Sequence, residues 1–252
     1  AQGDYIQYLD ADDILAPNKI EKQLQALKTT RPGTVASCGW GKFVEATETA
    51  EFAPQRVWCD FDDPIEWLLE AWEGGGMMQT ASWLTPRDVA EASGPWDESL
   101  TRNPADDGEY FCRVLLKSAG VRFCPEAKVY YREPGETNVS KALDSDAVHS
   151  LFMNCERYRE HVLPVKDSFR VRKALARNYA VFAYRFYPSH RRLADQALER
   201  IRELGVSPPA TVGGASFRWL SRLCGFQRAL RMRNTLRRTG CNAFRSCHGE
   251  NR

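Results

Sequence analysis

The chain has 252 residues, of which 43% are hydrophobic and 27% charged, and its formal net charge at pH 7 is +2. This composition excludes a disordered or fibrous protein, and no run of about 18 apolar residues predicts a helix across a membrane. The length suits one large domain, or a domain with an appendage.

The charge is divided unevenly along the chain. Residues 1–150 carry 14 Lys and Arg against 26 Asp and Glu, a net charge of −12. Residues 151–252 carry 21 against 7, a net charge of +14. The acidic part suits a metal site, and the basic part suits an anionic partner such as a membrane surface. None of the eight cysteines forms a CxxC pair, so we predict no zinc site and expect reduced thiols in the cytoplasm.

The first predicted element is a short buried strand, Tyr5 to Leu9, which ends at a cluster of carboxylates. Asp10, Asp12 and Asp13 fall within four residues, and a helix is predicted after Pro17. Ligands bind beyond the carboxyl ends of parallel strands, and adjacent carboxylates repel one another unless a cation lies between them. Hard oxygen ligands favour Mg²⁺ or Mn²⁺, although a solvated or helix-capping acidic loop is the alternative.

Helices and strands alternate in the next segment. Gly39–Gly41 is expected to interrupt the first strand, and the triple glycine at residues 74–76 is expected to form a flexible loop, because it lacks the Lys-Ser/Thr continuation of a phosphate loop. The predicted elements are a strand over 34–46, a helix over 64–72, a strand over 77–84 and a short helix over 87–92.

A second acidic cluster follows a turn that presents a tryptophan. The turn at Gly94-Pro95 places Trp96 beside Asp97, which suits a sugar-binding edge, although Trp96 packed on the core explains it equally well. Asp106 and Asp107 begin a helical pattern, where the macrodipole favours carboxylates, so capping is the alternative to catalysis for them.

The last part of the chain is predicted to be helical and basic. Two short strands around a Pro turn, over 121–132, and a loop over 133–140 come first. Helices are then expected over 146–161, 168–187, 193–204 and 216–238. The last helix interleaves seven arginines with Phe217, Leu220, Leu223, Leu230 and Leu236. Such a basic amphipathic helix suits an anionic membrane surface or a partner, a solvated helix is the alternative, and nucleic acid is not expected because no binding motif accompanies the charge.

Three stretches of the chain resemble one enzyme family. Residues 3–23 resemble the DxD region of the family 2 inverting glycosyltransferases of the GT-A fold, residues 94–100 resemble their acceptor-side loop, and residues 106–116 resemble their ED motif. The resemblance implies an α/β fold class, a GT-A (Rossmann-like) nucleotide-sugar transferase domain that lacks its N-terminal strands and is followed by a helical C-terminal region. We expect residues 1–143 to form the partial GT-A domain, and residues 144–252 to form the basic α-helical region. We also expect the chain to be a fragment of a longer protein.

The resemblance also implies roles for individual residues. Asp107 matches the general base, and Asp106 stands where the family has glutamate or glutamine. The residues expected to bind the metal and the sugar nucleotide are Asp10, Asp12, Asp13, Arg132 and Ser140, with Asp10 and Asp12 on the metal. The residues expected on the acceptor side are Gln79, Trp96, Asp97, Asp106 and Glu109.

These roles imply a metal-dependent hexosyltransferase that uses Mn²⁺ or Mg²⁺ and a nucleotide-sugar donor, which we expect to be a UDP-sugar. The acceptor hydroxyl would belong to a saccharide or a lipid-linked acceptor, and the transfer would invert the anomeric carbon. We expect a cytoplasmic protein, peripheral to the inner face of the membrane. Two alternatives remain: a sugar-nucleotide pyrophosphorylase-like enzyme, and a non-catalytic domain whose basic tail docks on a membrane or partner.

Overall fold

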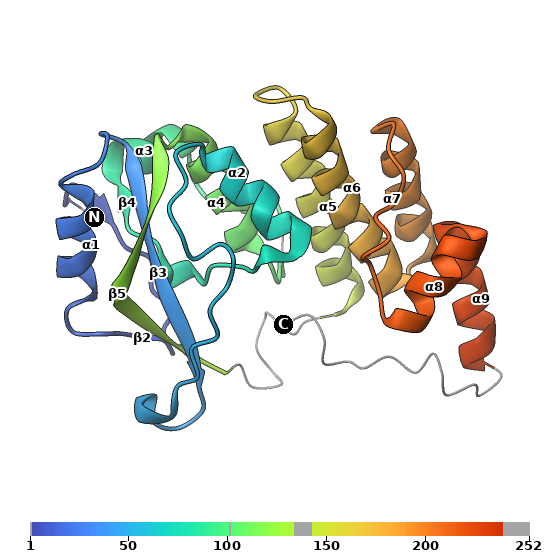
Figure 1. The fold of residues 1–252 in the computed structure, drawn as a ribbon, viewed down its shortest axis with the longest axis horizontal. Coiled ribbons are helices and arrows are strands. Elements are labelled where there is room, and N and C mark those ends of the chain that lie inside the picture. The colour runs from blue at the N-terminus through green and yellow to red at the C-terminus, as the bar shows by residue number, and fades with distance from the viewer. Residues whose placement is uncertain (1, 101, 134–142, 239–252) are drawn as a thin grey trace.

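The computed structural model of the protein describes residues 2–100, 102–133 and 143–238 (Figure 1). The strands of this part of the chain are β1 (Tyr5–Ile6), β2 (Ile14–Leu15), β3 (Thr34–Phe43), β4 (Thr85–Pro86) and β5 (Gly120–Arg132). The helices are α1 (Lys19–Leu27), α2 (Pro64–Glu70), α3 (Arg87–Ser93), α4 (Asp106–Lys117), α5 (Ser145–Val162), α6 (Phe169–Phe186), α7 (Arg191–Glu203), α8 (Ala215–Cys224) and α9 (Phe226–Arg238).

A three-stranded sheet in the order β2-β5-β3 forms the centre of the first half, and β1 pairs with β4 in a separate antiparallel ribbon. β3 and β5 run parallel, whereas β2 pairs antiparallel to the end of β5. The expected buried parallel strand over Tyr5–Leu9 is therefore wrong. Only Tyr5–Ile6 pairs, antiparallel to β4, and Tyr5 is 38% exposed. The pairing ends at Ile6, and the side chain of the next residue, Gln7, donates to the carbonyl oxygen of Ala81, at 3.0 Å.

The irregularity of the sheet lies in β5 and not in β3. β3 continues through Gly39–Gly41, so the predicted interruption there is wrong, and the two strands expected over 121–132 are one strand. The register shifts from Cys38 opposite Cys124 to Gly39 opposite Lys128, so three residues of β5 bulge around Pro125, which cannot donate to the ladder. Glycine is needed in β3 for a packing reason, since a Cβ atom on Gly41 would lie 2.6 Å from the ring of Phe52.

The strand expected over 77–84 is also wrong, because this segment forms a 3-10 turn at Thr80–Ser82. The amide oxygen of the Gln79 side chain accepts a hydrogen bond from the backbone N–H of Ala81, at 2.6 Å, and caps the turn. The side chain of Gln23 donates to the carbonyl oxygen of Ser82, at 2.8 Å. Side chains therefore satisfy backbone groups that a neighbouring strand would otherwise pair.

The predicted helices are present with small shifts at their ends, with one exception. The helix expected over 216–238 is two helices, α8 and α9, because Gly225 between them adopts a φ of +83°.

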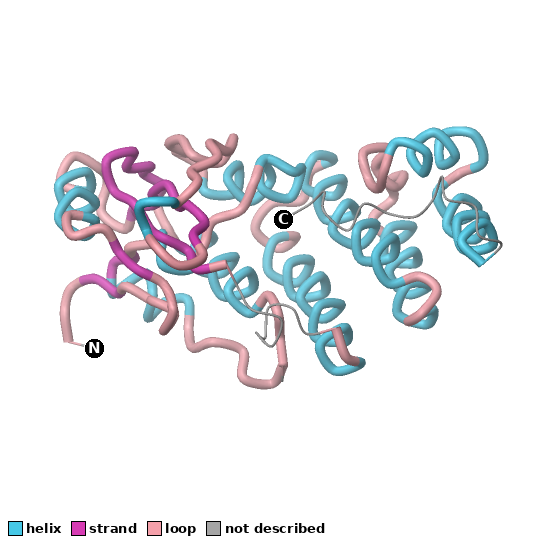
Figure 2. Tube along the Cα trace, turned by 90° about the horizontal axis from the view of Figure 1, so that it is seen from below, coloured by secondary structure: helices cyan, strands magenta, loops and turns pink. Residues whose placement is uncertain are grey.

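Helices α5 to α9 form an array beside the α/β part (Figures 1 and 2). The molecule is longest in the direction that runs from the α/β part to this array. One cluster of buried side chains runs from Val35 in β3 to Leu230 in α9. The expected division into two domains at residue 143 therefore stays a prediction. Among the described helices, none has the length and apolar character needed to cross a membrane.

Candidate active site

The first acidic cluster lies on a tight turn between β1 and β2. The backbone N–H of Asp13 donates to the carbonyl oxygen of Asp10, at 3.2 Å, which closes the turn. Asp10 and Asp12 are exposed, whereas Asp13 is only 7% exposed. The turn therefore presents two carboxylates to solvent and holds the third inside the protein.

Asp13 fixes this turn against the end of the sheet. One of its oxygens accepts from the backbone N–H of Arg132 in β5, at 2.9 Å, and the other accepts from the side-chain amide of Gln79. Burial raises the pKa of Asp13 to about 6, the Arg132 N–H opposes this shift, and the charges of Asp10 and Asp12 add to it. Burial and the charges of Asp12 and Asp106 likewise raise the pKa of Asp10.

Gln79, expected on the acceptor side, lies with the first acidic cluster. Its amide nitrogen bonds to Asp13 and lies 3.5 Å from Oδ2 of Asp10. The neighbouring Thr80 hydroxyl donates to Oδ2 of Asp107 across 3.4 Å. One short turn therefore connects the two carboxylate clusters, which are 95 residues apart in sequence from Asp12 to Asp107.

Asp107 lies in the first turn of α4, half-buried. Its Oδ1 accepts from the backbone N–H of Gly108, at 2.7 Å, and the Thr80 hydroxyl approaches Oδ2. Burial raises the pKa of Asp107 to about 6, the charge of Asp106 adds to this shift, the Gly108 and Thr80 donors oppose it, and Asp10 adds a smaller part. The charge of Asp106 raises the pKa of Asp10, and the charge of Asp10 raises the pKa of Asp107. The two clusters therefore influence each other's ionisation.

Tyr131 is a residue that the sequence analysis missed. Burial raises the pKa of its phenol, and the charges of Asp13, Asp107, Asp10 and Asp12 raise it further. The ring is half-buried and packs edge-on against Trp40, with ring centres 5.7 Å apart. The phenol of Tyr131 therefore stays neutral at physiological pH, and its pKa responds to the charges of both clusters. The sequence signal for it was its place next to Arg132 at the end of a strand.

Arg132 lies at the same end of β5, as expected. Its Nε donates to the carbonyl oxygen of Asp12, at 3.1 Å, and its Nη1 donates to that of Val44, at 2.9 Å. The guanidinium group covers the ring of Phe43 at 4.4 Å. Arg132 therefore places a positive charge against the backbone of the first acidic cluster. Ser140, its expected partner in donor binding, lies outside the described residues.

Trp96 lies in an aromatic cluster between the turn after α3 and helix α4. Its ring stacks on Tyr110 with ring centres 4.4 Å apart and an angle of 7° between the planes, and Tyr8 meets it edge-on at 5.3 Å. The hydroxyl groups of Tyr8 and Tyr110 lie 3.1 Å apart. One face of the Trp96 ring is therefore occupied by the protein, and the side chain as a whole is half-buried.

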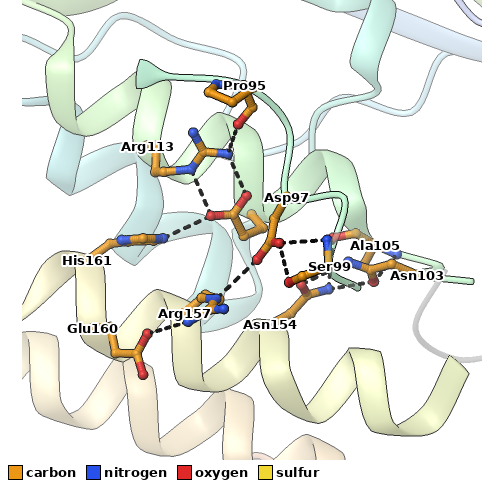
Figure 3. Close-up of polar contacts among 11 residues, drawn as sticks. Pro95, Asp97, Ser99, Asn103, Ala105, Arg113, Asn154, Arg157, Glu160 and His161 are labelled. Carbon is orange, nitrogen blue, oxygen red and sulfur yellow. Dashed lines mark hydrogen bonds and ion pairs between the residues drawn. The ribbon is translucent and has the colours of Figure 1, made fainter. Parts of the chain in front are cut away.

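Glu109 and Asp97 take part in a polar network between α4, the Trp96 loop and α5 (Figure 3). Glu109 is 2% exposed and accepts two hydrogen bonds from Arg113, each 2.8 Å long, while Nε2 of His161 lies 2.9 Å away. Asp97 pairs with Arg157 at 3.1 Å. Both carboxylates were expected to bind the acceptor, but as they stand they are committed to ion pairs that hold α4 and the loop on α5.

The acids of the two clusters carry the type of ligand atom that a hard divalent cation prefers. Asp10, Asp12, Asp13, Asp106 and Asp107 all carry carboxylate oxygens. Burial raises the pKa values of Asp10, Asp13 and Asp107, and repulsion from neighbouring carboxylates adds to the shift. A cation would relieve this repulsion. As arranged in the described part of the chain, no three His, Cys, Asp or Glu side chains meet closely enough to hold a metal.

Comparison with known proteins finds one family model and a set of solved structures that this chain resembles. Residues 1–83 match the family model described as "Glycosyl transferase family 2". A crystal structure of S. aureus TarS residues 1–349 in complex with UDP-GlcNAc matches with a TM-score of 0.58 and 10% sequence identity, over 95% of this chain and 69% of that one. A comparison with curated protein sequences gives no match. The structural match shows that the expected fold, an α/β GT-A domain followed by a helical region, is right.

Proposed function

Because residues 1–83 match the family model described as "Glycosyl transferase family 2" and the chain has the GT-A fold, we propose that it transfers a sugar from a UDP-sugar to an acceptor hydroxyl. The observation that carries this proposal is the turn at Gln79-Thr80, which joins the Asp10 and Asp13 carboxylates to that of Asp107. A displacement at an anomeric carbon needs a base on one side and charge stabilisation for the leaving group on the other. The two clusters supply these two functions.

Asp107 is the proposed base. With its pKa raised to about 6 by burial and by Asp106, it is ionised at neutral pH and more basic than an ordinary aspartate. The Gly108 N–H and the Thr80 hydroxyl hold its oxygens in place. The acceptor hydroxyl gives its proton to Asp107 as its oxygen bonds to the anomeric carbon. The bond from that carbon to the diphosphate oxygen breaks in the same step, which inverts the configuration.

The donor side is proposed to lie at the first cluster. Asp10 and Asp12 would hold Mn²⁺ or Mg²⁺, which neutralises the departing diphosphate when bound. Asp13 is a positioning residue, because it holds the turn through Arg132 and Gln79. The TarS structure contains UDP-GlcNAc, and this supports a uridine nucleotide as the donor class here.

The acceptor is proposed to be a saccharide or lipid-linked hydroxyl, and the sugar a hexose. The half-buried ring of Trp96 supports this choice, since apolar sugar faces pack on aromatic rings. Asp106, exposed beside the base, is placed to contact the same hydroxyl-rich ligand.

The experiment is a transfer assay with a panel of UDP-sugars and saccharide acceptors, in which UDP release and the anomeric configuration of the product are measured. Asp107→Asn should lower kcat by roughly a hundredfold to ten-thousandfold while UDP still binds, because general base catalysis contributes about this much. Glu45→Gln, an exposed acid outside the site, is the matched control. A chelator should abolish transfer and Mn²⁺ should restore it.

Two outcomes would contradict the proposal. Undiminished transfer by Asp107→Asn would remove this residue from the chemistry. Pyrophosphate exchange without sugar transfer would favour the pyrophosphorylase-like alternative, and nucleotide binding without either reaction would favour a non-catalytic domain.

A further inference from the structure

The apolar stripe expected to face a membrane or partner is largely used inside the protein. Phe217 and Leu220 of α8 and Leu230 of α9 are buried. The Phe217 ring packs against Tyr184 of α6, with ring centres 4.7 Å apart, and against Phe226, at 5.3 Å. These contacts attach α8 and α9 to the helical array, so any docking surface must lie on their other faces.

The other faces expose large apolar side chains. Trp219 is 64% exposed and Leu223 is 65% exposed, and the two lie one turn apart on α8. Met232 of α9 is 45% exposed, and its sulfur lies 3.8 Å from that of Cys224 at the end of α8. The contact brings the exposed side of α9 against the end of α8. Trp219, Leu223 and Met232 are thus the apolar part of what we call the α8–α9 surface.

The rest of the α8–α9 surface is made of exposed arginines: Arg218, Arg222, Arg228 and Arg231. The sequence contains no acidic residue between Glu203 and Glu250, whereas eight arginines lie in that interval. Within the described residues, these four arginines take part in no ion pair. In contrast, Arg170 of α6 pairs with Glu66 and Glu73. Within the part of the chain that the structure describes, no acidic side chain therefore neutralises the positive charge of these four arginines.

We propose that the α8–α9 surface docks on an anionic lipid bilayer. Trp219 and Leu223 would enter the headgroup region, where the amphipathic indole ring is favoured, and the four arginines would meet lipid phosphates. A surface helix with Trp and Leu beside Arg has the composition of a helix that lies in the plane of the membrane interface. Charge complementarity selects this occupant, because each basic residue near an anionic membrane surface strengthens the attraction to it.

The test is cosedimentation of the full chain with two kinds of vesicle. One kind contains phosphatidylcholine alone, and in the other about one-third of the phosphatidylcholine is replaced by the anionic lipid phosphatidylglycerol. The chain should bind only the anionic vesicles, and binding should weaken with added salt. Trp219→Ala with Leu223→Ser should weaken binding by about tenfold or more, because the apolar insertion is lost. Arg218→Gln with Arg222→Gln should weaken it by roughly tenfold to thirtyfold.

Matched control variants separate this surface from bulk effects. Phe169→Ala removes an exposed aromatic ring from α6, and Arg192→Gln removes an exposed charge from α7. Both should bind vesicles as the unaltered chain does. The proposal is overturned if the chain does not bind anionic vesicles, or if the Trp219 and Arg218 variants bind unchanged. It is also overturned if Trp219→Ala instead dissolves a dimer seen by light scattering, which would make the surface a contact between copies. Sugar transfer to a soluble acceptor is measured separately, so a failure of the proposed activity can be told apart from a failure of membrane docking.

Discussion

The Thr80 hydroxyl is placed to adjust the basicity of Asp107. It donates to the carboxylate across 3.4 Å, and a donor to the charged form of an acid lowers its pKa. We predict that Thr80→Val, which keeps the shape of the side chain but removes the donor, raises the pKa of Asp107 above its value of about 6. The acidic limb of the profile of kcat against pH should move to higher pH by several tenths of a unit, with KM for the donor unchanged.

Thr85→Val is the matched control for this prediction. Thr85 is also buried, and the described part of the structure gives its hydroxyl no hydrogen-bond partner. The pH profile of this variant should coincide with that of the unaltered chain. If Thr80→Val leaves the limb in place, or if both variants move it equally, Thr80 has no specific role beside the base.

Between elements, the pairing of α4 with α5 depends on Glu109. Burial opposes its ionisation, but His161 and Arg113 outweigh burial and hold the pKa of Glu109 below its usual range. The stabilisation is therefore present above the pKa of the unfolded state and is lost as the pH falls through the lower, folded pKa. We predict that Glu109→Gln lowers the free energy of unfolding by about 2 to 4 kcal/mol at pH 7, because it leaves Arg113 unpaired at a largely buried site.

Chemical denaturation of Glu109→Gln and of Glu98→Gln measures this difference, since Glu98 is an exposed acid in the loop that carries Trp96 and Asp97. A stability loss confined to Glu109→Gln would assign it to the framework of the site. Unchanged stability together with a raised KM for the acceptor would return it to the acceptor-binding role expected from the sequence.

How much the sequence predicted differs from element to element. The amphipathic helices α4 to α7 were predictable because their pattern is local, and the facing of two acid clusters followed from the family resemblance. The turn at Thr80–Ser82 was not predictable, because Gln7 and Gln23 bond to its carbonyl groups from distant positions in the sequence. The interactions of Gln79, Thr80 and Tyr131 with the acids also join residues that are distant in the sequence. The local pattern therefore led us to expect Gln79 on the acceptor side and gave no sign of Thr80 or Tyr131.

Across the whole molecule, the acids of the site oppose folding at neutral pH. The pKa of Asp107 rises from 3.8 to about 6 on folding, through burial and the charge of Asp106. The folded state therefore binds more protons than the unfolded state between these values, and the contribution of Asp107 to stability falls as the pH rises through this window. The molecule keeps a carboxylate that costs stability, and the proposed base chemistry gives a reason for it.

We predict that Asp107→Asn, although strongly impaired in transfer, is more stable than the unaltered chain by about 1 to 2 kcal/mol at pH 7.5, because it removes a charge that burial disfavours. The figure is smaller than the full pKa shift implies, because solvent partly screens a half-buried group. Near pH 4 the two proteins should differ little, since Asp107 is then protonated in the folded state. Urea denaturation at pH 4, 5, 6 and 7.5 measures the difference, with Glu45→Gln expected to show none. A difference that is the same at every pH would mean that the asparagine acts through packing and not through the removed charge. A destabilised variant would mean that the hydrogen bonds from Gly108 and Thr80 outweigh the repulsion from Asp106 and Asp10.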